Sequence, residues 1–290
     1  MDLASLRAFV EVAREGSFSQ AAENLFLTQP AISKRIAGLE EELATRLFDR
    51  AGRQILLTEA GRHLLPRAER IIHELTDIRR ELSNLSGEVS GRLAMATSHH
   101  IGLHRLPLVL RAYSDSYPKV ELDIHFMESE KACQAVEHGE LELAVVTLPL
   151  VPAETLNTEV IWRDPLQPVV GLDHPLARQR KVTVKELLVH PAVLPTRGTY
   201  TRTILEQRVN QLHGQVNCTL STDYLETLKM MASIGLGWSL LPEILLDEHL
   251  KPLAIPELDL IRSLGIVTHR KRTLSNAAGA MRRLLLEKVE

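Results

Sequence analysis

Five polar side chains near the start of the chain have the chemistry needed to contact a nucleic acid duplex. They are Thr28, Gln29, Ser33, Lys34 and Arg35. Amide and hydroxyl groups such as those of Gln29 and Ser33 form hydrogen bonds with base edges, whereas lysine and arginine bind phosphates or guanine. No acidic residue follows this group before Glu40. The pattern predicts a DNA-reading surface; the alternative interpretation is a solvated polar face on an ordinary helix.

Two short helices joined by a tight turn are predicted to position these side chains. Ser17 and Gln20 fit a capping box, in which each side chain binds an unpaired amide at the start of the first helix. Thr28 is suited to cap the second helix, whose start would enter the major groove, and Pro30 lies in its first turn. We expect this helix to end near Ala44. Its apolar side is formed by Ala31, Ile32, Ile36, Leu39 and Leu43.

A basic segment after the second helix predicts a two-stranded wing. Arg46, Arg50 and Arg53 flank a turn expected at residues 51–52, and residues 54–58 are expected to form a short strand. Arginines at the tip of such a wing reach the adjacent minor groove or phosphates; the alternative is a solvated charged loop. The predicted DNA contacts are Ser17, Thr28, Gln29, Pro30, Ser33, Lys34, Arg35, Arg50 and Arg53.

A long helix with a seven-residue repeat is predicted to follow the wing. Its apolar positions alternate spacings of four and three residues, at Leu64, Ala68, Ile71, Leu75, Ile78, Leu82 and Leu85. This is the repeat of a two-stranded coiled coil, so we expect the helix to pair two chains; packing against a core of the same chain is the alternative. Pro66 predicts a local bend in the helix. Two DNA-binding domains joined in this way would match an inverted repeat in DNA.

The DNA-reading segment closely resembles that of the LysR-type transcriptional regulators through the run TQPAISKRIAGLEEELATRLFDRAGRQILLTEAG. A looser resemblance extends to the end of the chain. It implies a winged helix-turn-helix over residues 1–58, a linker helix and hinge over 59–90, and a periplasmic-binding-protein-like α/β effector domain over 91–290. Two subdomains are implied, 91–163 with 264–290 and 164–263, joined by crossovers near Asp164 and Ser263. The family also implies a homotetramer that bends promoter DNA, with RNA polymerase as a further partner.

The last two hundred residues alternate strands and helices, which predicts a parallel sheet with helices on both faces. The expected strands are 93–97, 120–127, 143–147, 168–172, 192–195, 216–220, 237–241 and 264–268. The expected helices are 101–117, 131–139, 201–212, 223–234 and 276–288.

Small polar side chains gather where three of these strands end, which is where ligands bind in open α/β sheets. Free amides at helix starts and nearby hydroxyls favour an anionic group. The resemblance implies an effector between the subdomains, at Ser98, His99, Ser129, Thr147 and Thr196. Thr97 completes the first cluster, and His100 and Arg197 are added for their chemistry. The alternative for hydroxyls such as Ser98 and Ser129 is helix capping, and the charge of the effector stays open.

The remaining motifs argue against metal, redox and catalytic chemistry. His100 and His104 have a metal-binding spacing, but no carboxylate or cysteine lies nearby in the sequence, so a polar lining is favoured. Cys133 and Cys218 belong to no CxxC or Cys/His cluster, so buried free thiols are favoured over a redox pair. Because nucleophile-elbow, phosphate-loop and dinucleotide-binding motifs are absent, we expect no catalytic residues and no cofactor.

Composition is compatible with a regulator that holds its positive charge in one place. The 290 residues carry a net charge of −3, and 44% are apolar, which suffices for one small and one larger domain. No signal peptide or long apolar run is evident, so a cytoplasmic location away from membranes is expected. The sequence predicts a homo-oligomeric, effector-responsive transcription regulator. The alternatives are a small-molecule-binding module or enzyme with a helical dimerisation domain, and an architectural DNA binder without an effector.

Overall fold

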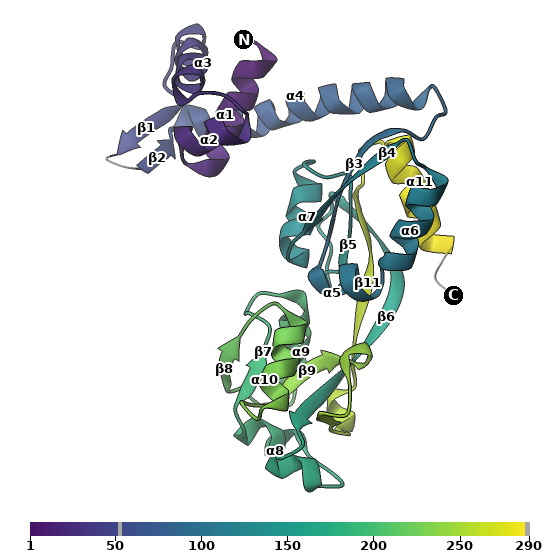
Figure 1. The fold of residues 1–290 in the computed structure, drawn as a ribbon. Helices are drawn as coiled ribbons and strands as arrows, with labels where there is room; N and C mark the ends of the chain where they lie inside the picture. The colour runs from purple at the N-terminus through teal and green to yellow at the C-terminus, as the bar shows by residue number, and fades with distance from the viewer. Residues whose placement is uncertain (52–53, 288–290) are drawn as a thin grey trace. The chain divides into compact units, whose positions relative to one another are not determined.

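The computed structural model describes residues 1–51 and 54–287 (Figure 1). Contacts within the chain separate two compact units, Met1–Ser86 and Gly87–Glu290, and each is described by itself.

The first unit opens with three helices, α1 (Leu3–Glu15), α2 (Phe18–Asn24) and α3 (Gln29–Glu42). Ser17 caps α2 as predicted, because its hydroxyl accepts from the Gln20 amide at 3.3 Å. The second half of the capping box is absent, since the Gln20 side chain donates to Glu23 and Asn24 instead. Thr28 occupies the N-cap of α3, but its side chain makes no capping hydrogen bond.

The helices enclose a small core that the predicted apolar side of α3 completes. Ile32, Ile36 and Leu39 are buried in it, and an aromatic group formed by Phe9, Phe18 and Phe48 lies beside them. Leu43, which was expected on the same side, is exposed because α3 ends one residue before it. The wing pairs β1 (Phe48–Ala51) with β2 (Gln54–Leu57) in antiparallel register.

The helix α4 (Glu59–Asn84) follows the wing, capped by the Thr58 hydroxyl at 3.0 Å from the Gly61 amide. It continues helical through Pro66. The predicted apolar seam divides into two parts. Leu64 and Ala68 pack into the core of their own unit, which is the alternative the sequence left open. The later seam residues Ile71, Leu75, Ile78, Leu82 and Leu85 are exposed.

The second unit begins with a parallel three-stranded core. The strands β3 (Gly91–Thr97), β4 (Val120–Phe126) and β5 (Leu143–Thr147) lie in the order β4-β3-β5. The surrounding helices are α5 (His99–His104), α6 (Pro107–Ser116), α7 (Ser129–Glu137) and α11 (Asn276–Glu287). The single helix expected over 101–117 is wrong, because α5 ends at His104 and α6 begins at Pro107, whose missing backbone N–H cannot continue the hydrogen bonds of a longer helix.

Two long strands pass between the halves of this unit (Figure 1). They are β6 (Leu156–Gly171) and β11 (Leu260–His269), which pair antiparallel to each other. Because β11 also runs antiparallel to β5, the expectation of a wholly parallel sheet is wrong. The sequence missed the first part of β6, whose burial follows no regular alternation. Gly265 permits the close approach, since a Cβ there would lie 2.0 Å from the Glu159 carbonyl oxygen.

The second half packs around the fully buried Trp238. Its strands are β7 (Ala192–Leu194), β8 (Cys218–Ser221), β9 (Ser239–Pro242) and β10 (Leu250–Pro252). Its helices are α8 (Val184–Val189), α9 (Tyr200–Gln211) and α10 (Leu225–Ser233), with short 3-10 turns at Pro175–Arg178, Glu243–Leu245 and Pro256–Leu258. Both β6 and β11 enter this half, where β9 and β10 pair with β6 and extend the sheet of the first half, whereas β7 and β8 form a separate parallel pair.

Candidate functional site

Six of the nine residues predicted to contact DNA lie together at the start of α3. Thr28, Gln29, Pro30 and Lys34 are exposed, and Ser33 and Arg35 are half-buried. The Gln29 amide donates to the Ser33 hydroxyl at 2.9 Å, which places both side chains on one face of the helix, one turn apart. Arg50 belongs to β1, opposite Ile55, whereas Arg53 lies outside the described residues. Ser17 is engaged in capping α2.

Glu40 has a structural role that the sequence did not reveal. Its carboxylate accepts from the backbone amides of Leu47 at 2.7 Å and Phe48 at 3.2 Å. These contacts fix the chain where it leaves α3 and enters the wing. Glu40 is thus more than the first acidic residue after the reading surface, because its side chain also positions that surface relative to β1.

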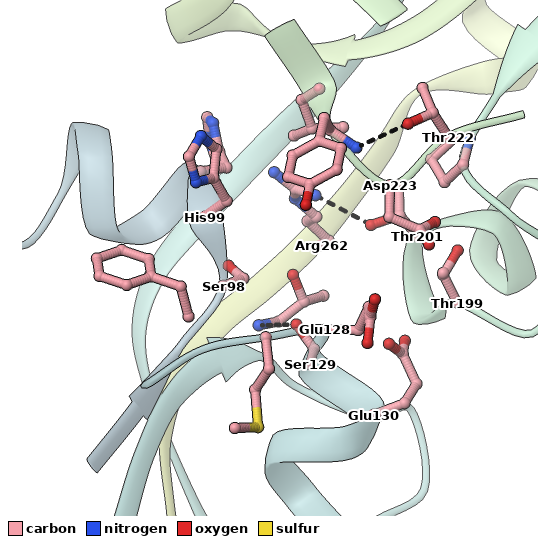
Figure 2. Close-up of a pocket in the computed structure, with 17 residues that line it drawn as sticks. Ser98, His99, Glu128, Ser129, Glu130, Thr199, Thr201, Thr222, Asp223 and Arg262 are labelled. Carbon is pink, nitrogen blue, oxygen red and sulfur yellow. Dashed lines mark hydrogen bonds between the residues drawn. The ribbon is translucent and has the colours of Figure 1, made fainter. Parts of the chain in front are cut away.

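The second unit holds a cavity of about 320 Å³ to which both of its halves contribute residues (Figure 2). The first half supplies residues that follow β3 and β4 and the last residue of β5. The second half supplies residues before and within the start of α9, a segment that leads into α10, and Arg262 of β11. The lining comprises Ser98, His99, His100, Phe126, Met127, Glu128, Ser129, Glu130, Thr147, Pro195, Thr199, Thr201, Thr222, Asp223, Tyr224, Leu225 and Arg262.

Five of the predicted effector residues line this cavity, namely Ser98, His99, His100, Ser129 and Thr147. Helix capping does not occupy the two serines. Ser98 precedes α5 without a capping hydrogen bond from its side chain, and the Ser129 hydroxyl accepts from the Thr147 amide at 3.1 Å. Burial, reinforced by nearby Arg262, lowers the pKa of His100 to about 3, so this ring is neutral near pH 7.

Three predicted residues lie outside the lining. The Thr97 hydroxyl is buried and donates to the Val145 carbonyl at 2.9 Å, because Thr97 belongs to the body of β3. The Thr196 amide donates to the Asp223 carboxylate at 3.0 Å, so the backbone of this residue holds Asp223, which does line the cavity. Arg197 is exposed and lies 3.8 Å from Glu206. Sequence spacing located the correct loop but could not tell which of its side chains turn inward.

Arg262 is the main lining residue that the sequence did not predict. It is buried, approaches the Asp164 carboxylate at 2.8 Å through Nε and donates to the Thr201 hydroxyl at 3.0 Å (Figure 2). Asp164 also accepts from Arg105 at 3.2 Å. Burial lowers the pKa of Arg262, and Asp164 opposes that shift. The signal in the sequence was an arginine within the apolar run of β11, directly beside a predicted crossover.

Acidic and aromatic side chains complete the cavity. The Glu130 carboxylate accepts from the Tyr200 backbone amide, and its burial raises the pKa of Glu130. Glu128 pairs with Lys131 at 2.7 Å. His99 lies edge-on to Phe126 of the first half and to Tyr224 of the second, with ring centroids 6.2 and 5.5 Å apart. The cavity therefore combines one arginine, several hydroxyls, acids and an aromatic edge.

Comparison with known proteins assigns both units to one class of DNA-binding regulators. Residues 3–62 match the family model described as bacterial regulatory helix-turn-helix protein, lysR family, and residues 86–290 match the LysR substrate binding domain. The chain belongs to the LysR-type transcriptional regulators, which are DNA-binding proteins with an effector-binding domain rather than enzymes. Among the described residues, no helix has the length and apolar character needed to span a membrane.

Individual relatives match either most of the chain or only one part of it. A probable RuBisCO transcriptional regulator of Thalassiosira pseudonana is 32% identical over 280 residues, covering 92% of this chain and 91% of that protein. An uncharacterised HTH-type transcriptional regulator of the ibpB–leuC intergenic region of Azotobacter vinelandii is 70% identical over 107 residues, covering 37% of this chain and 74% of that protein. The structure of full-length CbnR complexed with target DNA has a similar fold, with a TM-score of 0.64, 18% identity and full coverage of both chains.

Proposed function

We propose that this chain regulates transcription as a homo-oligomer that reads an interrupted palindrome and responds to a small molecule held between the halves of its second unit. The observation that carries the proposal is the cavity, because two separate halves contribute polar groups to its lining. A ligand that binds one arrangement of the halves better than another shifts the population toward it. That shift is the physical basis we propose for regulation.

DNA recognition is assigned to residues 1–58. The exposed start of α3 carries Gln29 and Lys34, and the solved CbnR structure is a complex of a similarly folded protein with its target DNA. Gln29 would hydrogen-bond a base edge, while Lys34 and Arg35 would bind phosphates or guanine. Arg50 and Arg53 of the wing would add contacts in the adjacent groove. The proposed promoter contacts retain Ser17, Thr28, Pro30 and Ser33 from the sequence prediction.

Pairing of two chains is assigned to the linker over residues 59–90. Ile71, Leu75 and Ile78 are exposed along α4, although apolar side chains at coiled-coil spacing are normally covered by a partner helix. A symmetric pair of chains would bind an inverted repeat. We further propose that two such pairs assemble into a tetramer. The protein is proposed to act in the cytoplasm, with RNA polymerase as a further partner.

Effector binding is assigned to residues 91–290, with subdomains 91–163 plus 264–290 and 164–263. The cavity volume lies near the lower end of the range for small-molecule sites. Ser98, Thr201 and Arg262 could bind an anionic group such as a carboxylate, while the acids of the lining already have partners of their own: Glu128 pairs with Lys131, and Glu130 and Asp223 accept from backbone amides. Phe126 and Tyr224 provide an apolar edge for the remainder of the molecule. We therefore propose a small carboxylate with an apolar portion as the effector class.

A thermal-shift screen of the full chain against small metabolites, followed by operator binding with each hit, tests this proposal. A ligand that binds only the folded protein raises its unfolding temperature in proportion to saturation. We expect carboxylates to give hits, and each hit to change operator affinity or footprint. Stabilisation only by cationic or purely apolar compounds would contradict the effector class. Hits without any effect on DNA binding would contradict the regulatory role of the cavity.

A further inference from the structure

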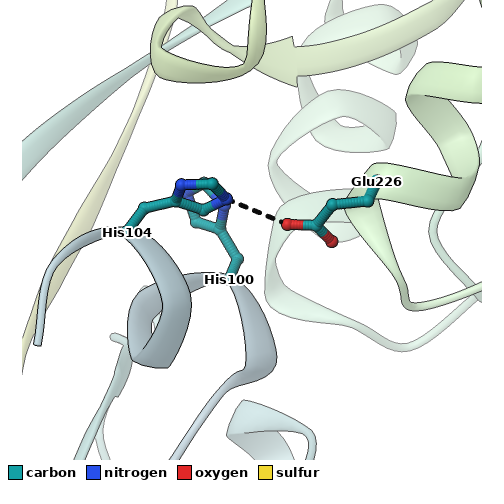
Figure 3. A group of neighbouring side chains, drawn as sticks. All are labelled: His100, His104 and Glu226. Atoms are coloured by element: carbon teal, nitrogen blue, oxygen red, sulfur yellow. Dashed lines mark hydrogen bonds and ion pairs between the residues drawn. The ribbon is translucent and has the colours of Figure 1, made fainter. Parts of the chain in front are cut away.

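Three side chains with metal-binding chemistry lie close together (Figure 3), and one of them, His100, also lines the cavity. His100 and His104 lie four residues apart on α5, and Glu226 lies at the start of α10 in the other half. Their ligand atoms all lie within 4.8 Å of one another. His104 Nε2 and Glu226 Oε1 are 3.1 Å apart. The fold therefore supplies the carboxylate that the sequence around the two histidines lacks.

The hydrogen bonding of this cluster is incomplete. Neither ring nitrogen of the buried His100 has a hydrogen-bond partner among the described residues, and neither does Oε2 of Glu226. Buried polar atoms in folded proteins are almost always paired. A His104–Glu226 hydrogen bond alone would explain one contact but would leave these three atoms unexplained. A bound cation between the side chains would use a lone pair of His100 and the carboxylate of Glu226.

The charges around the cluster are compatible with a cation. Arg105 and Arg262 are the nearby positive groups that act on His100, and Asp164 pairs with both of them. Glu226 contributes a negative charge of its own.

We propose that His100, His104 and Glu226 bind one divalent transition-metal ion, of which zinc is the representative. Two imidazoles and one carboxylate form a donor set suited to zinc and related borderline metals, and poorly suited to magnesium or calcium. Three protein ligands leave a fourth position for water or for an oxygen of a molecule in the cavity. Because the ligands come from both halves, the ion joins α5 to α10 and favours the arrangement in which they meet.

Zinc titration of the chelator-treated full-length protein by isothermal calorimetry tests this site. We expect one equivalent of Zn²⁺ to bind to the wild type, and His104→Ala or Glu226→Ala to weaken binding at least tenfold. His125→Ala is the matched control, because His125 also pairs with a carboxylate, Asp123 at 3.0 Å, but is exposed. Equal binding by the wild type and His104→Ala would overturn the proposal, as would an equal loss in His125→Ala.

A second measurement guards against variants that fail to fold. Glu226→His replaces the carboxylate with another zinc ligand and should retain one equivalent of metal. Co²⁺ added to the wild type should give visible absorption typical of nitrogen ligation, which a surface site without histidine would not give; its absence would overturn the proposal. Operator binding by the same variants distinguishes failure of the metal site from failure of the proposed regulatory function. Loss of zinc binding with unchanged operator binding would concern the metal site alone.

Discussion

The DNA-reading face and the effector cavity are built in opposite ways from the same chain. The reading face takes its polar groups from the first two turns of α3, so helical periodicity alone brings Gln29 and Ser33 together. The cavity takes its lining from positions as distant in the sequence as Ser98 and Arg262. Local spacing determines the reading face, whereas the cavity depends on the passage of β6 and β11 from one half of the second unit to the other. Disturbing each site should therefore have different consequences for stability and recognition.

The largest expected effect concerns the buried ion pair between Arg262 of β11 and Asp164 of β6. Arg262→Ala leaves the Asp164 carboxylate buried with only Arg105 as a charged partner, so the second unit should lose about 3 kcal/mol of unfolding free energy. Urea unfolding followed by tryptophan fluorescence reports on this unit alone, because Trp162 and Trp238 are the two tryptophans of the chain. The exposed Arg111→Ala serves as the control. If Arg262→Ala loses no more unfolding free energy than Arg111→Ala, the stability of the second unit does not depend on the ion pair between Arg262 and Asp164.

Interrupting the exposed seam of α4 tests whether recognition requires two copies of the reading face. Leu75→Glu should prevent pairing of the helices and weaken binding to a palindromic operator about a hundredfold, because the two half-sites are then bound independently. Sedimentation should detect the loss of the dimer. Arg70→Glu adds the same acid at an exposed position of α4 outside the seam. If Leu75→Glu remains dimeric, the exposed seam is not the pairing surface.

A single contact on the reading face should have a smaller and more local effect. Gln29→Ala should reduce discrimination by about 1–3 kcal/mol at one base pair per half-site and leave the other positions unchanged. Competition between operator variants measures this directly. Gln20→Ala removes a comparable amide from α2, where the side chain bonds only neighbouring residues. Unchanged preference in Gln29→Ala would assign base recognition to other side chains.

The same contrast explains how far the sequence could predict the molecule. Periodicity located α2, α3 and the wing, because those elements depend on neighbours close in the chain. It located the strand β5 exactly but assigned a parallel direction to the last strand, because direction depends on a crossover that no local pattern records. Ser98 and Ser129 were found because each lies where a strand is followed by the start of the next helix. Arg262, Asp223 and Glu226 were missed because their roles arise only when the two halves meet.

A change confined to the cavity should affect the effector response and spare DNA binding. Ser98→Ala removes one hydroxyl that helix capping does not use, so effector affinity should fall by about 1 kcal/mol, or roughly fivefold. Operator affinity without the effector should match that of the wild type. The control is Ser116→Ala, at the exposed end of α6. An unchanged effector response would remove Ser98 from the site, whereas a loss of basal DNA binding would contradict the separation of the two regions.

The smallest expected effect concerns Cys133, which is buried within α7. Burial raises the pKa of Cys133 from near 9.0 to about 11, so the reactive thiolate should be roughly a hundredfold scarcer near pH 7 than in an ordinary cysteine. The folded state favours the protonated thiol, so the stability this group contributes is complete below pH 9 and is lost as the pH rises toward 11. Thiol-reagent kinetics at pH 7.5 should show Cys133 reacting far more slowly than the half-buried Cys218, and Cys133→Ala should keep the effector response. Equal rates, or an effector response lost in Cys133→Ala, would instead place the thiol in the regulatory machinery.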